Sequence, residues 1–253
     1  MVMKTFWILI AFIILPVFAY EVYTPSDYKY TESGDKLLFV VDYSNSMSEY
    51  LEHKTKVNQV REMMDYILPQ ISPDTKVGLR VYGHTCNLLA YNACRSSELV
   101  VPMGINNAKA ISSEMSRLRP RGMTPITYSL KQAVNKDLSG QKNTKHIILL
   151  TDGGENCDES PCDYAIELVK TRKDIKIDVI AYNVHDEDDL AQLRCTADVT
   201  GGRIVEADTK AQLFRSMEDL ILPHKNVEAV IIVENNLPLP HKNVEAVLYN
   251  GEG

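Results

Sequence analysis

Five oxygen-bearing side chains are spaced along the chain in a way that suits a hard divalent cation. Asp42, Ser44 and Ser46 alternate directly after an apolar run, LLFVV. Thr124 lies in the segment GMTP, and Asp152 follows a second apolar run in HIILLTDGG. Carboxylate and hydroxyl oxygens are the ligands that such ions prefer. The pattern therefore predicts one metal site that is assembled from three separate segments.

The apolar runs before Asp42 and Asp152 are typical of strands that are buried on both faces, as in a parallel sheet. From residue 35 to residue 222, short apolar runs alternate with segments whose apolar residues recur at helical spacing, which indicates an α/β fold. The predicted strands cover residues 36–41, 76–82, 98–102, 145–151, 177–182 and 202–206. Sites in open α/β sheets form at the carboxyl ends of the strands, where both acids are expected.

Three predicted helix starts lie close to these strand ends. Residues 46–49, SMSE, have the pattern of a capping box, and residues 160–163, SPCD, combine a cap with a proline in the first turn. Thr124, which is followed by proline, is a similar start. We expect its backbone N–H groups to face the metal site and to favour an anion there.

In order and type, the five residues resemble the metal-ion-dependent adhesion site (MIDAS) of the von Willebrand factor type A (vWA) family. The resemblance spans residues 35–222 and implies a Rossmann-like, doubly wound α/β fold with a mostly parallel six-stranded sheet flanked by helices. The loop of residues 152–162 and the segment LRC around Cys195 resemble those of bacterial secreted members. The expected source is therefore a bacterium.

The resemblance also implies a role for each residue. Ser44 and Ser46 bind the ion through their hydroxyls, and Thr124 binds it directly or through water. Asp42 and Asp152 act mainly through bound waters and by orienting the hydroxyls. The expected ion is Mg²⁺, with Mn²⁺ or Ca²⁺ as alternatives. Because neutral hydroxyls leave the ion under-neutralised, it attracts a carboxylate, so the expected partner is a protein that offers an Asp or Glu side chain.

The function expected from this site is metal-dependent protein binding and not catalysis, because no base is evident beside the ion. One alternative is a structural or assembly protein that docks without the metal, through another face or its C-terminal tail. A second alternative is a phosphatase-like hydrolase with Asp42 as the nucleophile. That chemistry needs an acid two residues later, where this chain has Ser44.

Two further clusters are candidate cation sites. His84, Cys86 and Cys94 are three potential zinc ligands, although a disulfide is the preferred interpretation of the cysteines in an exported chain. Residues 185–189, HDEDD, follow a predicted strand and are interpreted as favourable charge in the first turn of a helix, with a second cation site as the alternative.

The two ends of the chain are expected to lie outside the vWA domain of residues 35–222. Residues 1–19 have the basic start, apolar stretch and small final residue of a signal peptide, so we expect an exported protein: periplasmic, cell-surface or secreted. Residues 20–34 form a polar lead-in, and residues 223–253 a tail. The sequence LPHKNVEAV begins at residue 222 and recurs at residue 239, as a duplication in a tolerant tail or as a short β-ribbon.

The net charge of −7, without a cluster of Lys and Arg, argues against nucleic acid and anionic membrane surfaces as partners. No membrane span is expected in the mature chain, because the apolar stretch near the start is too short to be one. The five cysteines predict two disulfides and one remaining thiol. Local bonds, Cys86 to Cys94 and Cys157 to Cys162, are the simplest arrangement. Cys195 competes for the second pair, and the sequence leaves the pairing open.

Overall fold

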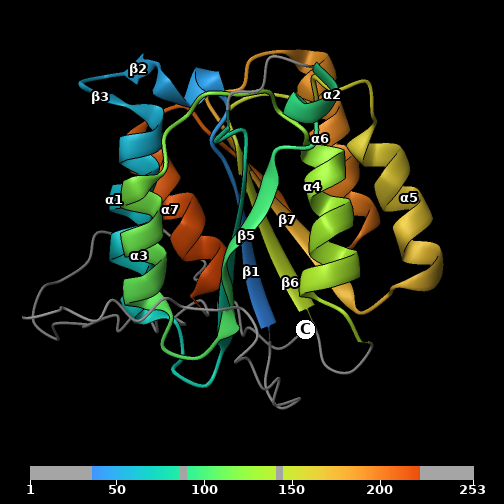
Figure 1. Cartoon of the computed structure of the whole chain (residues 1–253), viewed down its shortest axis with the longest axis horizontal. Coiled ribbons are helices and arrows are strands. Elements are labelled where there is room, and N and C mark those ends of the chain that lie inside the picture. The colour runs from blue at the N-terminus through green and yellow to red at the C-terminus, as the bar shows by residue number, and fades with distance from the viewer. Residues whose placement is uncertain (1–35, 86–89, 141–144, 223–253) are drawn as a thin grey trace, which may run out of the picture. The chain divides into compact units, whose positions relative to one another are not determined.

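A computed structural model describes residues 36–85, 90–140 and 145–222 (Figure 1). The predicted signal peptide, the lead-in and the duplicated tail lie outside these residues. Within the described part of the chain, no helix is both long and apolar enough to cross a membrane.

A six-stranded sheet forms the centre of the fold, as predicted. Its strands follow the order β5-β4-β1-β6-β7-β8, and every neighbouring pair is parallel except β4 with β5. The bounds are β1 Lys36–Asp42, β4 Lys76–Tyr82, β5 Ser97–Gly104, β6 Lys145–Thr151, β7 Ile175–Tyr182 and β8 Ile204–Ala207. The predicted ranges of β4 and β6 coincide with the observed ones, and the other four differ by a few residues at their ends.

Helices cover both faces of this sheet (Figure 1). One apolar cluster joins the sheet to α1 (Lys56–Ile67), α3 (Ala108–Arg117) and α7 (Lys210–Ile221). A second cluster, on the opposite face, joins it to α4 (Ile126–Gln132), α5 (Pro161–Thr171) and α6 (Glu187–Val199). The shorter elements are η2 Asn45–Ser48, β2 Tyr50–Leu51, β3 Lys54–Thr55, η3 Leu68–Gln70, α2 Ala90–Ala93 and η4 Ala133–Asp137.

The strand order places the predicted site at the point where the winding of the sheet reverses. β1 lies between β4 and β6, so the chain first builds the sheet outward on one side of β1 and then continues on the other. Crossover helices on opposite faces diverge at such a point and leave a crevice outside the carboxyl ends of the strands. In register, Val41 faces Leu150 across the β1–β6 pair, so the segments after both strands begin side by side.

The predicted helix starts are only partly correct. Ser160 does cap α5, because its hydroxyl accepts a hydrogen bond from the Asp163 N–H at 3.1 Å. The predicted capping box at residues 46–49 was wrong: Ser46 lies inside the 3₁₀ helix η2, and its hydroxyl bonds to Asp152. The helix after Thr124 begins at Ile126 without a side-chain cap. In both places the hydroxyl is directed to a tertiary partner, so a local pattern could not locate the helix start.

The disulfides differ from the simplest expectation. The bonds join Cys94 to Cys157 and Cys162 to Cys195, so both local pairs, Cys86 with Cys94 and Cys157 with Cys162, were wrong. Each bond follows from tertiary packing: α5 lies against α6, which brings Cys162 to Cys195, and the loop after β6 meets the segment after α2. Cys86, the fifth cysteine, lies outside the described residues.

We predict that this connectivity is found in the purified protein. After free thiols are blocked, proteolysis without reductant should release peptides that link Cys94 to Cys157 and Cys162 to Cys195 by mass spectrometry. The first bond closes a loop with a sequence separation of 63. Cys94→Ser should therefore lower the free energy of unfolding by about 4 kcal/mol. A peptide that links Cys157 to Cys162 would contradict the structure.

Candidate metal centre

Asp42 ends β1 and is fully buried, with each carboxylate oxygen held by a neutral donor. Oδ1 accepts a hydrogen bond from the Ser44 backbone N–H at 2.6 Å, and Oδ2 accepts one from the Thr151 hydroxyl at 2.8 Å. Thr151 is the last residue of β6, so this contact joins the carboxyl ends of the two strands. The carboxylate is therefore fixed in position without a cation on either oxygen.

Ser44, Ser46 and Asp152 form a continuous chain of hydrogen bonds beside Asp42. The Ser44 and Ser46 hydroxyl oxygens lie 3.0 Å apart, and the Ser46 hydroxyl donates to Oδ1 of Asp152 at 2.7 Å. Together with the Ser44–Asp42 bond, these contacts connect four of the five predicted residues. Both carboxylates and two hydroxyls are thus brought together at the carboxyl ends of β1 and β6.

Thr124 lies on a segment that contacts this cluster, but its own hydrogen bonds point elsewhere. Gly122 pairs with Ser44 in a parallel bridge. Two residues on, the Thr124 backbone N–H donates to the Asn156 side-chain oxygen at 2.7 Å, and its hydroxyl accepts from the Asn156 amide at 3.3 Å. The structure therefore places Thr124 next to the cluster without a direct bond to it.

The backbone N–H groups that were expected to face the metal site at the start of α4 already donate hydrogen bonds within the protein. The Thr127 N–H donates to Oε2 of Glu155 at 2.7 Å, in addition to the bond from Thr124 to Asn156. The loop after Asp152 therefore supplies the anion that was expected from outside. The expectation that these N–H groups are available to a ligand was wrong, because the sequence does not show how this loop folds back.

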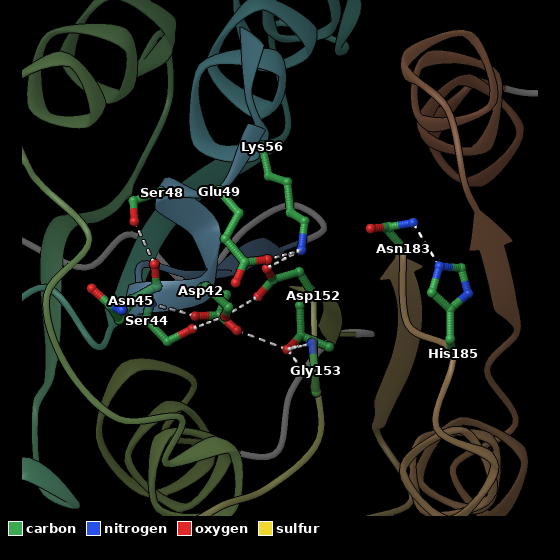
Figure 2. A network of polar contacts seen from close by, with 12 residues as sticks. Asp42, Ser44, Asn45, Ser48, Glu49, Lys56, Asp152, Gly153, Asn183 and His185 are labelled. Atoms are coloured by element: carbon green, nitrogen blue, oxygen red, sulfur yellow. Dashed lines mark hydrogen bonds and ion pairs between the residues drawn. The ribbon is translucent and has the colours of Figure 1, made fainter. Parts of the chain in front are cut away.

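Lys56 is the residue at this site that sequence analysis missed. Its Nζ lies 2.9 Å from Oδ2 of Asp152 and 3.1 Å from Oε2 of Glu49 (Figure 2). The short hairpin of β2 and β3 returns the chain to η2, where the Lys56 N–H donates to the Glu49 backbone oxygen at 2.9 Å. A lysine at the start of a helix carries no signal of its own, so only the hairpin pairing could have indicated it.

Burial is the largest influence on the pKa of both acids. Burial, followed by the negative charge of Asp152, raises the pKa of Asp42 to about 7. Burial also raises the pKa of Asp152, against the opposing effects of Ser46 and Lys56. For Lys56, burial lowers the pKa, but the Asp152 and Glu49 carboxylates outweigh it and raise the pKa overall. The cluster therefore contains two buried carboxyl groups, those of Asp42 and Asp152, but only the Lys56 ammonium to compensate their charge.

The two other candidate cation clusters are not supported. Asp186 caps α6, and Asp189 accepts a hydrogen bond from the Gly154 N–H at 3.0 Å, so the acidic run serves the helix and the Asp152 loop. Cys94 is in a disulfide and His84 lies 3.1 Å from Glu98, which makes the zinc interpretation wrong. Within residues 36–85, 90–140 and 145–222, no group of three or more His, Cys, Asp or Glu side chains is arranged to hold a metal.

Comparison with known proteins gives a consistent family. The model of the von Willebrand factor type A domain matches residues 36–219 of this chain. The uncharacterized protein YwmC of Bacillus subtilis (strain 168) is 27% identical over 175 residues, which cover 68% of this chain and 76% of that protein.

Solved structures show the same fold. BatB from Bacteroides thetaiotaomicron has a TM-score of 0.58 at 15% identity, covering 74% of this chain and 97% of that chain. Proximal thread matrix protein 1 from the mussel byssus, with zinc in its MIDAS motif, has a TM-score of 0.56 at 19% identity, covering 74% of this chain and 44% of that one.

Gly83, which follows β4, allows the site segments to approach one another. Its φ is +71°, and a Cβ at this position would lie 2.6 Å from the Ser44 backbone nitrogen. The Gly83 oxygen accepts a hydrogen bond from the Gly122 N–H at 2.7 Å, so Gly83 lies between the segments of Ser44 and Thr124. A larger residue would separate them.

We predict that Gly83→Ala lowers the free energy of unfolding by about 3 kcal/mol or more, from backbone strain and a backbone clash together. Gly201→Ala is the matched control, because Gly201 has a φ of +72° and nothing within 4 Å of the added Cβ. In the control, the free energy of unfolding should fall only by the cost of the backbone strain, about 1–2 kcal/mol. Urea unfolding measures both, and equal losses would contradict the close approach at Ser44.

Proposed function

Because the chain belongs to the von Willebrand factor type A family, we propose that it is an extracytoplasmic interaction module. It holds a divalent cation, Mg²⁺ in the first place, and uses that ion to capture an Asp or Glu carboxylate of a protein partner. The observation that carries the proposal is the hydrogen-bonded chain of Ser44, Ser46 and Asp152 at the switch point of the sheet.

The donor set fits a hard cation. Ser44, Ser46 and Thr124 offer neutral oxygens, while Asp42 and Asp152 offer the charge, and an all-oxygen set suits Mg²⁺ better than zinc. The buried Tyr82 hydroxyl adds support, because it has no hydrogen-bond partner among the described residues. It lies near Asp42, whose charge raises its pKa after the larger effect of burial. A buried donor of this kind is usually satisfied by ordered water.

The bound ion would supply a positive charge that the hydroxyls leave incompletely neutralised, and this charge favours an acidic side chain as the final ligand. The residues of this chain contribute by fixing the geometry: Thr151 and the Ser44 N–H hold Asp42, and Ser46 holds Asp152. We propose no catalytic step. Lys56, the basic group at the site, is engaged by two carboxylates and does not serve as a base.

Two observations support the cation and the location. The mussel byssus protein with the same fold holds zinc in its MIDAS motif, which supports a divalent ion at the corresponding place in this chain. The structure contains two disulfides, and these persist in oxidising compartments outside the cytoplasm.

We predict that Mg²⁺ raises the melting temperature and that EDTA reverses the effect. At about 100 times the dissociation constant, the rise should be about 5–10 °C for a domain of this size. Ser46→Ala should abolish most of this rise, because it removes a ligand and the donor to Asp152. Ser48→Ala is the matched control, since the Ser48 hydroxyl is exposed and bonds to the Asn45 oxygen. The absence of a rise in the wild type, or an equal rise in Ser46→Ala, would contradict metal binding.

We also predict metal-dependent capture of a partner. Full-length wild type, Ser46→Ala and Ser48→Ala are used as bait for extracytoplasmic proteins, with Mg²⁺ and with EDTA. A protein retained by the wild type and by Ser48→Ala only in Mg²⁺, and lost with Ser46→Ala, is the expected result. Retention in EDTA would instead indicate docking through a face that does not use the ion.

A further inference from the structure

Asp152 divides its two carboxylate oxygens between different partners. Oδ1 accepts from the Ser46 hydroxyl at 2.7 Å, on the side of the predicted ligands. Oδ2 lies 2.9 Å from the Lys56 ammonium, on the side of α1 (Figure 2). Asp152 therefore belongs both to the candidate metal site and to an ion pair that the predicted ligand set does not include.

The position of the Lys56 ammonium is fixed by burial and by two carboxylates. Its side chain is 6% exposed and that of Asp152 is 0% exposed, whereas that of Glu49 is 66% exposed. The backbone N–H of Lys56 is bonded to the Glu49 oxygen, which holds the start of α1 against η2. A buried ammonium is costly unless it is paired, so we expect Lys56 to stay beside Asp152.

We infer that Lys56 is an internal counter-cation for Asp152 and sets how tightly the site holds a divalent ion. This role rests on the proposed function. An ion that approaches Oδ1 meets a carboxylate whose charge Lys56 already compensates, and the ammonium also repels the ion. Without an ion, the same ammonium prevents Asp152 from being an uncompensated buried charge. Glu49 moderates the repulsion, because it shares Lys56.

The test compares Mg²⁺ binding by isothermal titration calorimetry and by melting temperature in full-length variants. Lys56→Met, similar in shape but without charge, should bind Mg²⁺ at least ~10-fold more tightly than the wild type and should melt at a lower temperature without metal. Lys56→Arg keeps the charge and should keep the wild-type affinity. Lys54→Met is the matched control, since Lys54 is paired with Glu62 and not with Asp152; its affinity should not change.

Equal or weaker Mg²⁺ binding by Lys56→Met, while the wild type binds, overturns the role of Lys56 and leaves the proposed function standing. Failure of the wild type and of every variant to bind Mg²⁺ overturns both. If Lys56→Met shows no cooperative melting, Glu49→Gln replaces it, because this side chain is mostly exposed. Glu49→Gln leaves the ammonium entirely on Asp152 and should weaken Mg²⁺ binding about threefold. An unchanged affinity in that variant overturns the role of Lys56.

Discussion

The site is organised around two carboxylates that are buried close together at the carboxyl ends of neighbouring parallel strands. Asp42 ends β1 and Asp152 follows β6, and the charge of Asp152 raises the pKa of Asp42. Buried charge of one sign is costly, so the surrounding residues must compensate it. They do so with hydroxyls, backbone N–H groups and one ammonium. In the proposed function, one of the hydroxyls among these groups, that of Ser46, is also a ligand of the divalent ion.

The loop of residues 152–162 turns this electrostatic arrangement into a fixed geometry. Its disulfides attach it at Cys157 to the segment after α2 and at Cys162 to α6. Between these bonds and Asp152, Asn156 holds Thr124 and Glu155 holds the first turn of α4. The loop therefore connects Asp152 through hydrogen bonds to the segment that carries Thr124, the remaining predicted ligand.

The strands and the edge that carries the site could be predicted from the sequence, because both depend on strong, short-range patterns. The apolar runs before Asp42 and Asp152 are typical of buried parallel strands, and the carboxyl ends of parallel strands lie at the same edge of the sheet. Errors occurred where a local pattern competed with a tertiary partner. Ser46 has the pattern of a helix cap, yet its hydroxyl meets Asp152, which is more than a hundred residues away. The predicted disulfide pairing was wrong for the same reason. Sequence proximity favoured Cys162 as the partner of Cys157, whereas the packing of α5 against α6 brings Cys195 to Cys162.

Lys56 shows most clearly what a motif leaves out. The MIDAS pattern specifies oxygen ligands, but the affinity of such a site also depends on how much of their charge the protein itself neutralises. In the proposed function, the module must remain folded when the ion is absent, so the buried carboxylates need an internal counter-charge, which weakens ion binding. Lys56 meets this need. Its ammonium pairs with Oδ2 of Asp152 and compensates the carboxylate without occupying the side of Oδ1, which the Ser46 hydroxyl faces. In the proposed role of Lys56, one residue outside the motif sets the balance between stability without the ion and affinity for it.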